Sequence, residues 1–260
     1  MEIYYPEFFR VYEYQNKVRY GSKKDGGYVI GKLSKEAYDC YISAGVSNEE
    51  SFTRDFLEEY NIPMKDCYAF DGTIKEYPRE YCEEINFIGK NIQFYNDEKH
   101  TNLDNLFEKY HNIFLKMDIE SFEYPWIMKL KINDLKKIKQ CVIKFHGIND
   151  NSWNRTHNEK IKCFSKFAKT HFLIHAHCDN IGQLHINGMP NILECTYMNY
   201  KEFNCIPPFN GSFLPIDSLD YPNTKKMKDY NLNYYPFMYN AKIIQPNMIY
   251  RIVNTHTDHP

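Results

Sequence analysis

Between about residue 38 and residue 197, short apolar runs alternate with stretches of helix-like composition. This alternation is typical of an α/β domain with a mainly parallel sheet, because parallel strands are joined by crossovers that usually form helices. We predict seven strands, at residues 38–44, 67–71, 85–88, 112–118, 141–145, 171–177 and 191–197. The helix-like stretches are residues 49–60, 103–110, 125–139 and 158–168.

The last two predicted strands have no helix between them. Residues 179–190 are rich in turn-forming residues, so these two strands are expected to pair antiparallel. The outline is that of a Rossmann-like class I methyltransferase, with a seven-stranded, mostly parallel sheet. Its last strand is antiparallel and lies between the fifth and the sixth. Other α/β folds share the first half of this outline.

Two segments lie outside the predicted core of residues 38–197. Residues 1–37 form an N-terminal extension, and residues 198–260 form a C-terminal one that is rich in Pro, Asn and Tyr. We expect the C-terminal extension to be irregular and to pack on the core. One late strand is expected in it, near residues 241–244 or 248–253.

Composition excludes several classes of partner. The chain has 260 residues and a formal net charge of -2, so no basic field predicts a nucleic-acid partner. No stretch approaches the ~20 apolar residues of a membrane helix, so no membrane association is expected. The eight cysteines include no C-x-x-C pair, which disfavours a zinc knuckle. We interpret them as buried free thiols in a reducing, cytoplasmic location.

The turn after the first predicted strand reads Ser-Ala-Gly-Val at residues 43–46. A glycine in a strand-to-helix turn lets a ligand approach the backbone, and a helix N-terminus favours anionic groups. Asp71 ends the second strand, where an acid can accept hydrogen bonds from ribose hydroxyls. An ordinary turn and a helix N-cap are the structural alternatives. Together the two features favour a nucleoside ligand, without separating an adenosine methyl donor from NAD.

The fourth predicted strand carries charged residues near its carboxyl end. Lys116, Asp118 and Glu120 alternate with apolar residues and therefore share one face. Parallel strands are normally apolar throughout, so three charged side chains need an explanation. A capped strand end with Lys116 neutralising Asp118 explains the lysine more readily than it explains all three.

Three histidines are expected at the same edge of the sheet. His146 follows the fifth strand directly, and His175 and His177 share one face of the sixth. With the seventh strand between them, His146 and the pair would be separated by ~10 Å of backbone, near Asp118. This placement favours a functional site. The alternative is that one histidine is catalytic and the others brace the loop at residues 178–180.

Short strings over most of the chain belong to one pattern: Arg19-Tyr20-Gly21, Asp25-Gly26-Gly27-Tyr28, Ser43-Ala44-Gly45-Val46, Phe70-Asp71, Leu115-Lys116-Met117-Asp118-Ile119-Glu120, Phe145-His146-Gly147, Ile174-His175-Ala176-His177, Glu194-Cys195-Thr196-Tyr197 and Leu219-Asp220-Tyr221-Pro222-Asn223. In these strings the chain resembles the FkbM-type methyltransferases, and more closely a branch found in large DNA viruses and bacteria. It departs from the family at two positions. Ser121 stands where the family usually has glycine, and Lys144 stands where an acid is common.

The resemblance implies an S-adenosylmethionine-dependent O-methyltransferase whose acceptor is a carbohydrate, methylated on a sugar hydroxyl of a glycan. Such a hydroxyl is a weak acid and needs a base. His146 is the preferred base and Asp118 its orienter or a second acid, and His175 or His177 would exchange roles with His146. The donor-binding residues would be Ser43, Ala44, Gly45, Val46, Asp71, Gly72 and Asp118. The acceptor-binding residues would be Lys116, Glu120 and Asn180. A divalent metal, if present, would be ligated by Asp118, Glu120, His146 and His175.

Two other functions remain open. The fold could be a catalytically decayed methyltransferase that acts as a binding or assembly module. It could also be a His/Asp metal-dependent hydrolase, although that activity leaves the pairing of Gly45 with Asp71 unexplained.

Overall fold

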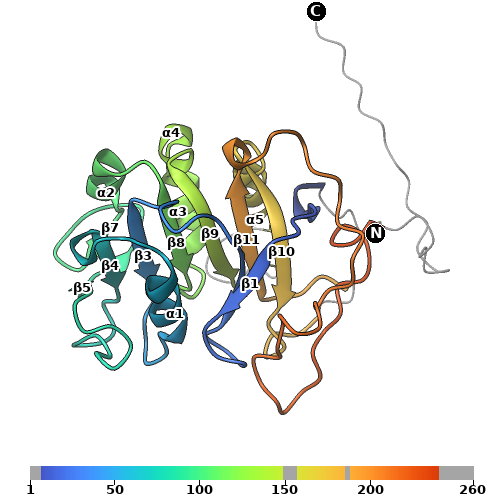
Figure 1. Cartoon of the computed structure of the whole chain (residues 1–260), viewed down its shortest axis with the longest axis horizontal. Coiled ribbons are helices and arrows are strands. Elements are labelled where there is room, and N and C mark those ends of the chain that lie inside the picture. Colours follow the sequence, from blue (N-terminus) through green and yellow to red (C-terminus); the bar gives the residue numbers. More distant parts are fainter. Residues whose placement is uncertain (1–6, 149–156, 185–187, 240–260) are drawn as a thin grey trace, which may run out of the picture.

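The computed structural model describes residues 7–148, 157–184 and 188–239. Its centre is a seven-stranded sheet with the order β10-β11-β9-β8-β3-β4-β5 (Figure 1). The strands are β3 (Cys40–Ala44), β4 (Cys67–Phe70), β5 (Asn86–Ile88), β8 (Ile113–Met117), β9 (Ile138–Phe145), β10 (His171–Cys178) and β11 (Leu193–Asn199). Only β11 is antiparallel to its neighbours, and it lies between β9 and β10. The seven predicted strands and the class I methyltransferase fold are thus confirmed.

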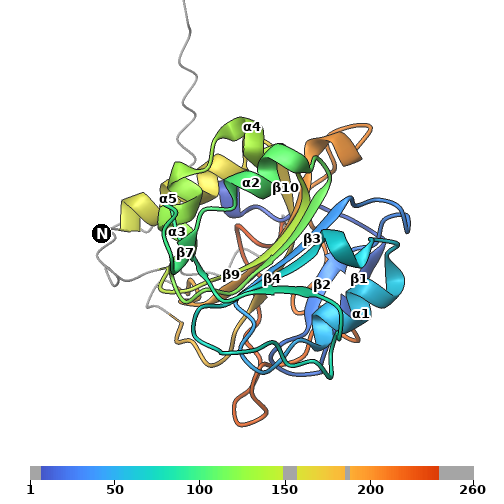
Figure 2. The same cartoon turned by 90° about the vertical axis from the view of Figure 1, so that its left-hand side faces the viewer.

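Helices cover both faces of the sheet. Helix α1 (Ser51–Glu59) lies on one face, and the other helices lie on the opposite face (Figure 2). These are α2 (Asp104–Lys109), α3 (Glu123–Lys129), α4 (Ile132–Leu135) and α5 (His157–Phe167). One helix was expected at residues 125–139, but the structure has two short ones, α3 and α4. They are separated because the backbone is extended at Leu130 and Lys131.

Strand alternation divides the core into two layers. Tyr41 of β3 and Phe114 of β8 pack against Phe56 of α1 in one buried cluster. The next residues along these strands, Ile42 and Leu115, belong to the cluster on the other face, with the aromatic residues of α3 and α5. A sheet with both faces covered requires such continuous apolar strands, which explains why the sequence pattern located them.

The N-terminal extension contributes a hairpin that the sequence pattern did not predict. Strands β1 (Lys17–Tyr20) and β2 (Tyr28–Gly31) pair antiparallel and lie on the α1 face of the sheet. Gln140 of β9 bonds both the N–H and the C=O of Gly31, and the Thr196 hydroxyl of β11 donates to the Val29 carbonyl. These bonds join the hairpin to the centre of the sheet.

The remaining elements are short. They are η1 (Glu7–Phe9), η2 (Met64–Asp66), η3 (Tyr200–Glu202) and a small parallel pair, β6 (Asn91–Ile92) and β7 (His100–Thr101). From residue 203 to residue 239 the chain is irregular, as expected. The late strand predicted near 241–244 or 248–253 lies outside the described residues. Among the helices of the described part, none has the length and apolar character needed to cross a bilayer.

A buried ion pair lies beneath the turn after β3. The Lys116 ammonium of β8 is 2.5 Å from a Glu50 carboxylate oxygen, and both side chains are buried. Glu50 also accepts hydrogen bonds from the hydroxyls of Ser43 and Thr53, and Lys116 donates to the Gly45 carbonyl. Lys116 was expected to contact the substrate, but its ammonium is used inside the protein.

Breaking this pair should destabilise the fold. Lys116→Met leaves the Glu50 carboxylate buried without its cation, and the free energy of unfolding should fall by ~3–5 kcal/mol. Lys32→Met removes a partly exposed ion pair with Glu59 and should cost less than ~1 kcal/mol. Urea unfolding of both variants makes the comparison. Equal losses would show that the buried pair has no special weight, whereas Lys116→Met combined with Glu50→Gln should recover part of the loss.

Candidate functional site

The candidate site lies at the carboxyl ends of β3 and β8, the two central strands. From β3 the sheet continues through β4 to β5, and from β8 it continues the other way to β9. In open α/β sheets ligands bind outside the carboxyl ends of the strands at such a switch point. Two of the predicted site residues, Gly45 and Asp118, follow these strands directly and meet here.

The backbone of Gly45 packs directly on that of Asp118. Gly45 has a φ of +80°, and a Cβ at this position would lie 1.7 Å from the Asp118 carbonyl oxygen. The Asp118 N–H donates to the Ala44 carbonyl at 2.9 Å. Glycine is therefore required at residue 45 by the neighbouring strand, independently of any ligand.

Asp71 holds the turn after β3. Its Oδ2 accepts hydrogen bonds from the backbone N–H groups of Val46 and Ser47, both at 3.0 Å. Its Oδ1 accepts from the N–H and the hydroxyl of Thr73. Burial raises the pKa of Asp71, but these hydrogen bonds lower it more, and the pKa ends below its usual value. All four acceptor positions are used, so Asp71 is not a free acceptor for ribose hydroxyls as expected.

The other residues assigned to the donor lie around this turn. Ser43 and Ala44 are fully buried below the edge of the sheet, and the Ser43 hydroxyl donates to Glu50. The Gly72 N–H donates to the Asn91 side chain, and a Cβ on Gly72 would meet that side chain at 2.7 Å. These residues were expected to contact the donor. At the carboxyl ends of the strands, the turn therefore offers its backbone rather than its side chains.

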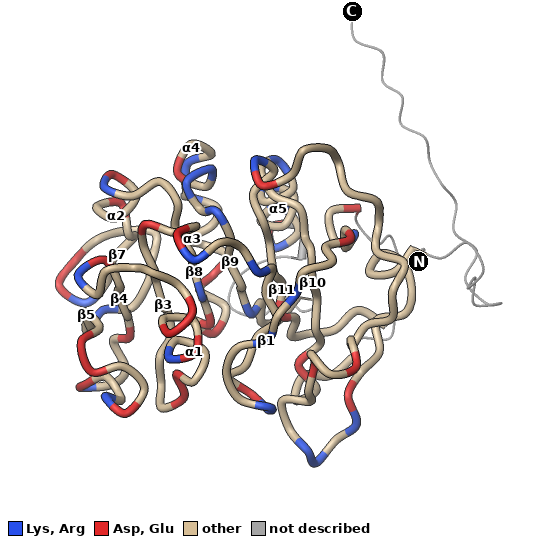
Figure 3. The backbone as a smooth tube through the Cα atoms, in the orientation of Figure 1, with Lys and Arg blue, Asp and Glu red and all other residues tan. Residues whose placement is uncertain are grey.

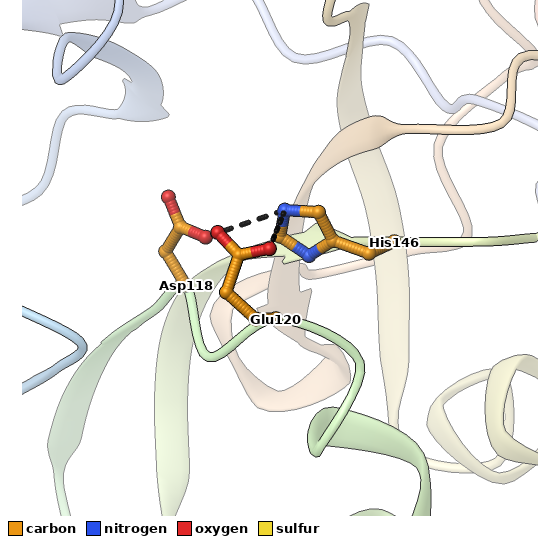
Figure 4. Close-up of side chains that lie close together, drawn as sticks. All are labelled: Asp118, Glu120 and His146. Carbon is orange, nitrogen blue, oxygen red and sulfur yellow. Dashed lines mark ion pairs between the residues drawn. The ribbon is translucent and has the colours of Figure 1, made fainter. Parts of the chain in front are cut away.

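His146 lies among three carboxylates. Its Nδ1 is 3.3 Å from Glu123 Oε1, and its Nε2 is 3.6 Å from Asp118 Oδ1 and 3.7 Å from Glu120 Oε2. Figure 4 shows the Asp118 and Glu120 side chains, both from the segment after β8, directed at one edge of the imidazole. The structure thus brings together three of the predicted residues.

Glu123 was missed by the sequence analysis. It begins α3, is fully buried and contacts the far side of the His146 ring. An acidic residue in the first turn of a helix is usually a solvated partner of the helix dipole, so the pattern gave no reason to place it in the site. The one available signal was the apolar run Tyr124–Ile127 that follows it, which buries the start of this helix.

The carboxylates change the protonation of His146. Burial lowers the pKa of the imidazole, but the hydrogen bond to Glu123 and the charges of Glu123, Asp118 and Glu120 raise it more, to about 9. At neutral pH the ring therefore carries both protons and cannot accept another. In this state His146 is poorly suited to the role of base that the sequence analysis expected, and the neighbouring Asp118 Oδ1 has no hydrogen-bond partner among the described residues.

The second oxygen of Asp118 is held from the opposite side. Tyr28 OH is 3.3 Å from Asp118 Oδ2, and the Lys144 ammonium is 3.8 Å from it. Asp118 Oδ1 is buried and has no hydrogen-bond partner within the described part of the chain. The carboxylate is thus oriented with one oxygen toward the hairpin and the other toward His146.

Lys144 lies in a second group of carboxylates. Its ammonium is 2.7 Å from Asp179 Oδ2 and 2.9 Å from Asp25 Oδ1. Burial lowers the pKa of Lys144, but the carboxylates of Asp118, Glu194 and Asp179 raise it well above its usual value. Residues of both signs are spread along the chain (Figure 3); in this group Lys144 and Asp179 are buried, whereas the Asp25 side chain is 51% exposed. Lys144, where the resembled family commonly has an acid, is the cation of this group.

His175 and His177 lie apart from His146. His175 Nε2 is 2.9 Å from Asp220, while His177 lies between Glu194 at 3.0 Å and Asp229 at 3.1 Å. Asp220 and Asp229 belong to the C-terminal extension. The two histidines are therefore its anchors, and no hydrogen bond or ion pair joins them to His146 within the described residues.

Asn180 has a similar function. It is fully buried and donates to the backbone carbonyls of Thr224 and Met227. This contact fixes the C-terminal extension and leaves no amide group for an acceptor, which was the role expected for Asn180.

A cavity of about 810 Å³ lies between the two extensions, with Tyr14, Lys17, Asn210, Phe213 and Asn233 among its lining residues. None of the residues that line it belongs to the site described above. Its position therefore does not alter the assignment of the site to the carboxyl ends of β3 and β8.

The anchoring by His177 predicts a pH-dependent stability. Burial lowers the pKa of His177, but Asp229 and Glu194 raise it more, to about 10. A folded-state pKa above the unfolded value of ~6.5 gives stability that is complete below pH ~6.5 and is lost as the pH rises toward 10. Unfolding free energies measured from pH 6.5 to 9.5 should fall by up to ~1.4 kcal/mol per pH unit.

His177→Gln should reduce this slope, because its side chain no longer titrates, while the loss due to His146, whose pKa is also raised, to about 9, should remain. His100→Gln removes a histidine that pairs with Asp97 at the surface and should leave the dependence unchanged. A wild-type slope that persists in His177→Gln would contradict the assignment.

The sequence matches no family model. No curated protein matches it either. The fold is similar to that of N-methyltransferase NodS from Bradyrhizobium japonicum WM9, at 11% identity and a TM-score of 0.37, covering 64% of this chain and 89% of that one. It is also similar to Aeropyrum pernix fibrillarin with natively bound S-adenosyl-L-methionine, at 9% identity and a TM-score of 0.37, covering 64% and 69%. Likeness this weak adds nothing to the strand order, on which the fold assignment rests.

Proposed function

We propose that the protein is an S-adenosylmethionine-dependent methyltransferase that methylates a hydroxyl oxygen. The observation that carries this proposal is the class I methyltransferase sheet with a glycine turn and a carboxylate–imidazole group at its switch point. A ligand held at the turn after β3 would lie next to the proton-accepting Asp118, because these backbones are in contact.

The turn after β3 is shaped by Asp71, because the N–H groups of Val46 and Ser47 both donate to one oxygen of its carboxylate. These two N–H groups are therefore already used, and a donor would meet the remaining backbone of the glycine turn. When bound, S-adenosylmethionine supplies an activated methyl group on a sulfonium. Asp71 would hold the turn in shape and so position the donor indirectly.

The acceptor site is assigned to Asp118, Glu120 and His146. A hydroxyl must lose its proton as its oxygen is methylated, and Asp118 Oδ1 is the buried oxygen without a hydrogen bond. His146, fixed by Glu123, would stabilise the negative charge that develops on the acceptor oxygen. Glu120 extends from the same segment into solvent and would contact the remainder of the acceptor.

A sugar hydroxyl as acceptor, and membership of the FkbM-type branch, rest on the resemblance of the sequence strings. The buried positions of Lys116 and Asn180 remove two expected acceptor contacts, so recognition of a sugar would rely on Glu120 and His146. A catalytically decayed binding module would bind S-adenosylhomocysteine but show no turnover. A turnover assay therefore separates this function from that of an active methyltransferase.

Donor binding is tested by calorimetry with S-adenosylhomocysteine, for which we expect micromolar affinity. Asp71→Asn keeps one carbonyl oxygen and cannot hold both Oδ1 and Oδ2 contacts, so affinity should fall roughly ten- to a hundredfold. Asp39→Asn is the matched control. Asp39 accepts from the N–H groups of His111 and Asn112 at the other edge of the sheet. No binding to the wild type, or equal losses in the two variants, would refute the donor site.

The role of Asp118 is tested by turnover. Asp118→Asn removes the proton acceptor, and the rate should fall by ~10²–10⁴ while affinity for S-adenosylhomocysteine changes by no more than a few-fold. The assay measures release of S-adenosylhomocysteine from S-adenosylmethionine with a panel of monosaccharides and nucleotide sugars. Loss of donor affinity in this variant would assign Asp118 to the donor instead.

A further inference from the structure

We propose that Asp118, Glu120 and His146 bind one divalent transition-metal ion. One ligand atom from each of these residues lies within 4.8 Å of the other two. Binding of the ion can be tested without an activity assay. The placement of that ion next to the acceptor hydroxyl rests on the proposed function.

The separations within this group fit ligands better than hydrogen bonds. His146 Nε2 is 3.6 Å from Asp118 Oδ1 and 3.7 Å from Glu120 Oε2, beyond hydrogen-bond distance. Two ligand atoms that each lie ~2.1 Å from a common ion are about 3.0–3.6 Å apart at bond angles of 90–120°. Figure 4 shows the two carboxylates directed at the same imidazole nitrogen, with the space between them common to all three.

A buried carboxylate oxygen without a hydrogen bond, next to a ring nitrogen without one, provides a second, independent observation. The His146 side chain is 10% exposed, and its Nε2 has no hydrogen bond to a described residue. Asp118 Oδ1 is buried and also has no partner among the described residues. Buried polar atoms are normally paired, because an unpaired one loses its hydration. A shared cation between these two atoms would satisfy both.

The residues around the group orient it as metal ligands usually are. The buried Glu123 carboxylate lies at Nδ1, the nitrogen of His146 that faces away from the other two residues. Tyr28 and Lys144 hold the second oxygen of Asp118 and turn the first toward His146. Carboxylates behind ligating histidines and fixed ligand carboxylates are the usual surroundings of metal sites.

The other carboxylate group provides a contrast. Asp25, Asp179 and Glu194 also have suitable spacing for an ion. The Lys144 ammonium, however, lies 2.9 Å from Asp25 and 2.7 Å from Asp179, so a cation already fills this group. The group at His146 has no lysine or arginine at such distances among the described residues; its nearest is Lys144, 3.8 Å from the far oxygen of Asp118.

The donor set indicates the class of ion. Imidazole suits first-row transition ions, and carboxylates suit Mn²⁺ in particular, whereas Ca²⁺ and Mg²⁺ prefer sites made wholly of oxygen. One imidazole with two carboxylates therefore favours Mn²⁺ or Zn²⁺. Three protein ligands leave a position for water or for an acceptor oxygen, as in catalytic sites. Binding of the ion would displace the proton on His146 Nε2 and use Asp118 Oδ1 as a ligand, so in the metal-bound protein the ion, rather than these two side chains, would make the acceptor hydroxyl more acidic.

The test is a titration of the full chain with Mn²⁺, followed by electron paramagnetic resonance of the free ion, and with Zn²⁺ by calorimetry. The wild type should bind one ion. Glu120→Gln should weaken binding at least tenfold without affecting the fold, because the Glu120 side chain is 75% exposed. Asp25→Asn is the matched control from the group that Lys144 fills, and its affinity should stay within about twofold of wild type.

Three results would overturn the cation site. These are no saturable binding of either ion at millimolar concentration, unchanged affinity in Glu120→Gln, or an equal loss in Asp25→Asn. S-adenosylhomocysteine is titrated separately, with and without EDTA. If S-adenosylhomocysteine binds but no ion does, the cation site is refuted and the proposed function stands. If an ion binds but S-adenosylhomocysteine does not, the proposed function is refuted and the cation site stands.

Discussion

The contact between Gly45 and the Asp118 carbonyl determines how the whole edge of the sheet is built. Because Gly45 has no Cβ, the turn after β3 can lie directly against the end of β8. Below the contact, Lys116 donates to the Gly45 carbonyl and pairs with the buried Glu50. The turn after β3 and the segment that begins with Asp118 are thus packed against each other and held by shared contacts, so a displacement of either strand end would disturb both.

The same edge shows how much the sequence determined. The strands were predictable because a parallel sheet with two covered faces needs continuous apolar runs, and those runs are visible in the sequence. The β1–β2 hairpin was not, because Lys17–Tyr20 is short, half-exposed and lacks such a run. Gly45 and His146 directly follow predicted strands and Asp118 ends one, and the structure places all three at the carboxyl ends of these strands.

The roles of these residues were harder to predict, since they depend on partners distant in sequence. Asp71 lies at the end of its strand as expected, but its oxygens are used by the turn 24 and 25 residues earlier. His175 and His177 share a face, yet their partners Asp220 and Asp229 are 45 and 52 residues away, in an irregular segment without periodicity. Local sequence patterns predict that a residue lies at the carboxyl end of a strand. Whether its side chain is available for a ligand depends on the packing of distant segments, which these patterns do not show.

One row of charges links the extensions to the site. His177 is in register with Glu194, and Glu194 with Lys144, across β10, β11 and β9. Lys144 then reaches Asp118 at the end of β8, so the sign alternates along four adjacent strands. Without its neighbour, each of these side chains would carry a charge that is not fully neutralised, because all but Asp118 are nearly or fully buried. The C-terminal extension supplies Asp229 at one end of the row, and the hairpin supplies Tyr28 at the other. The extensions therefore set the orientation of the Asp118 carboxylate, although the described part of neither places a charged group of its own next to His146.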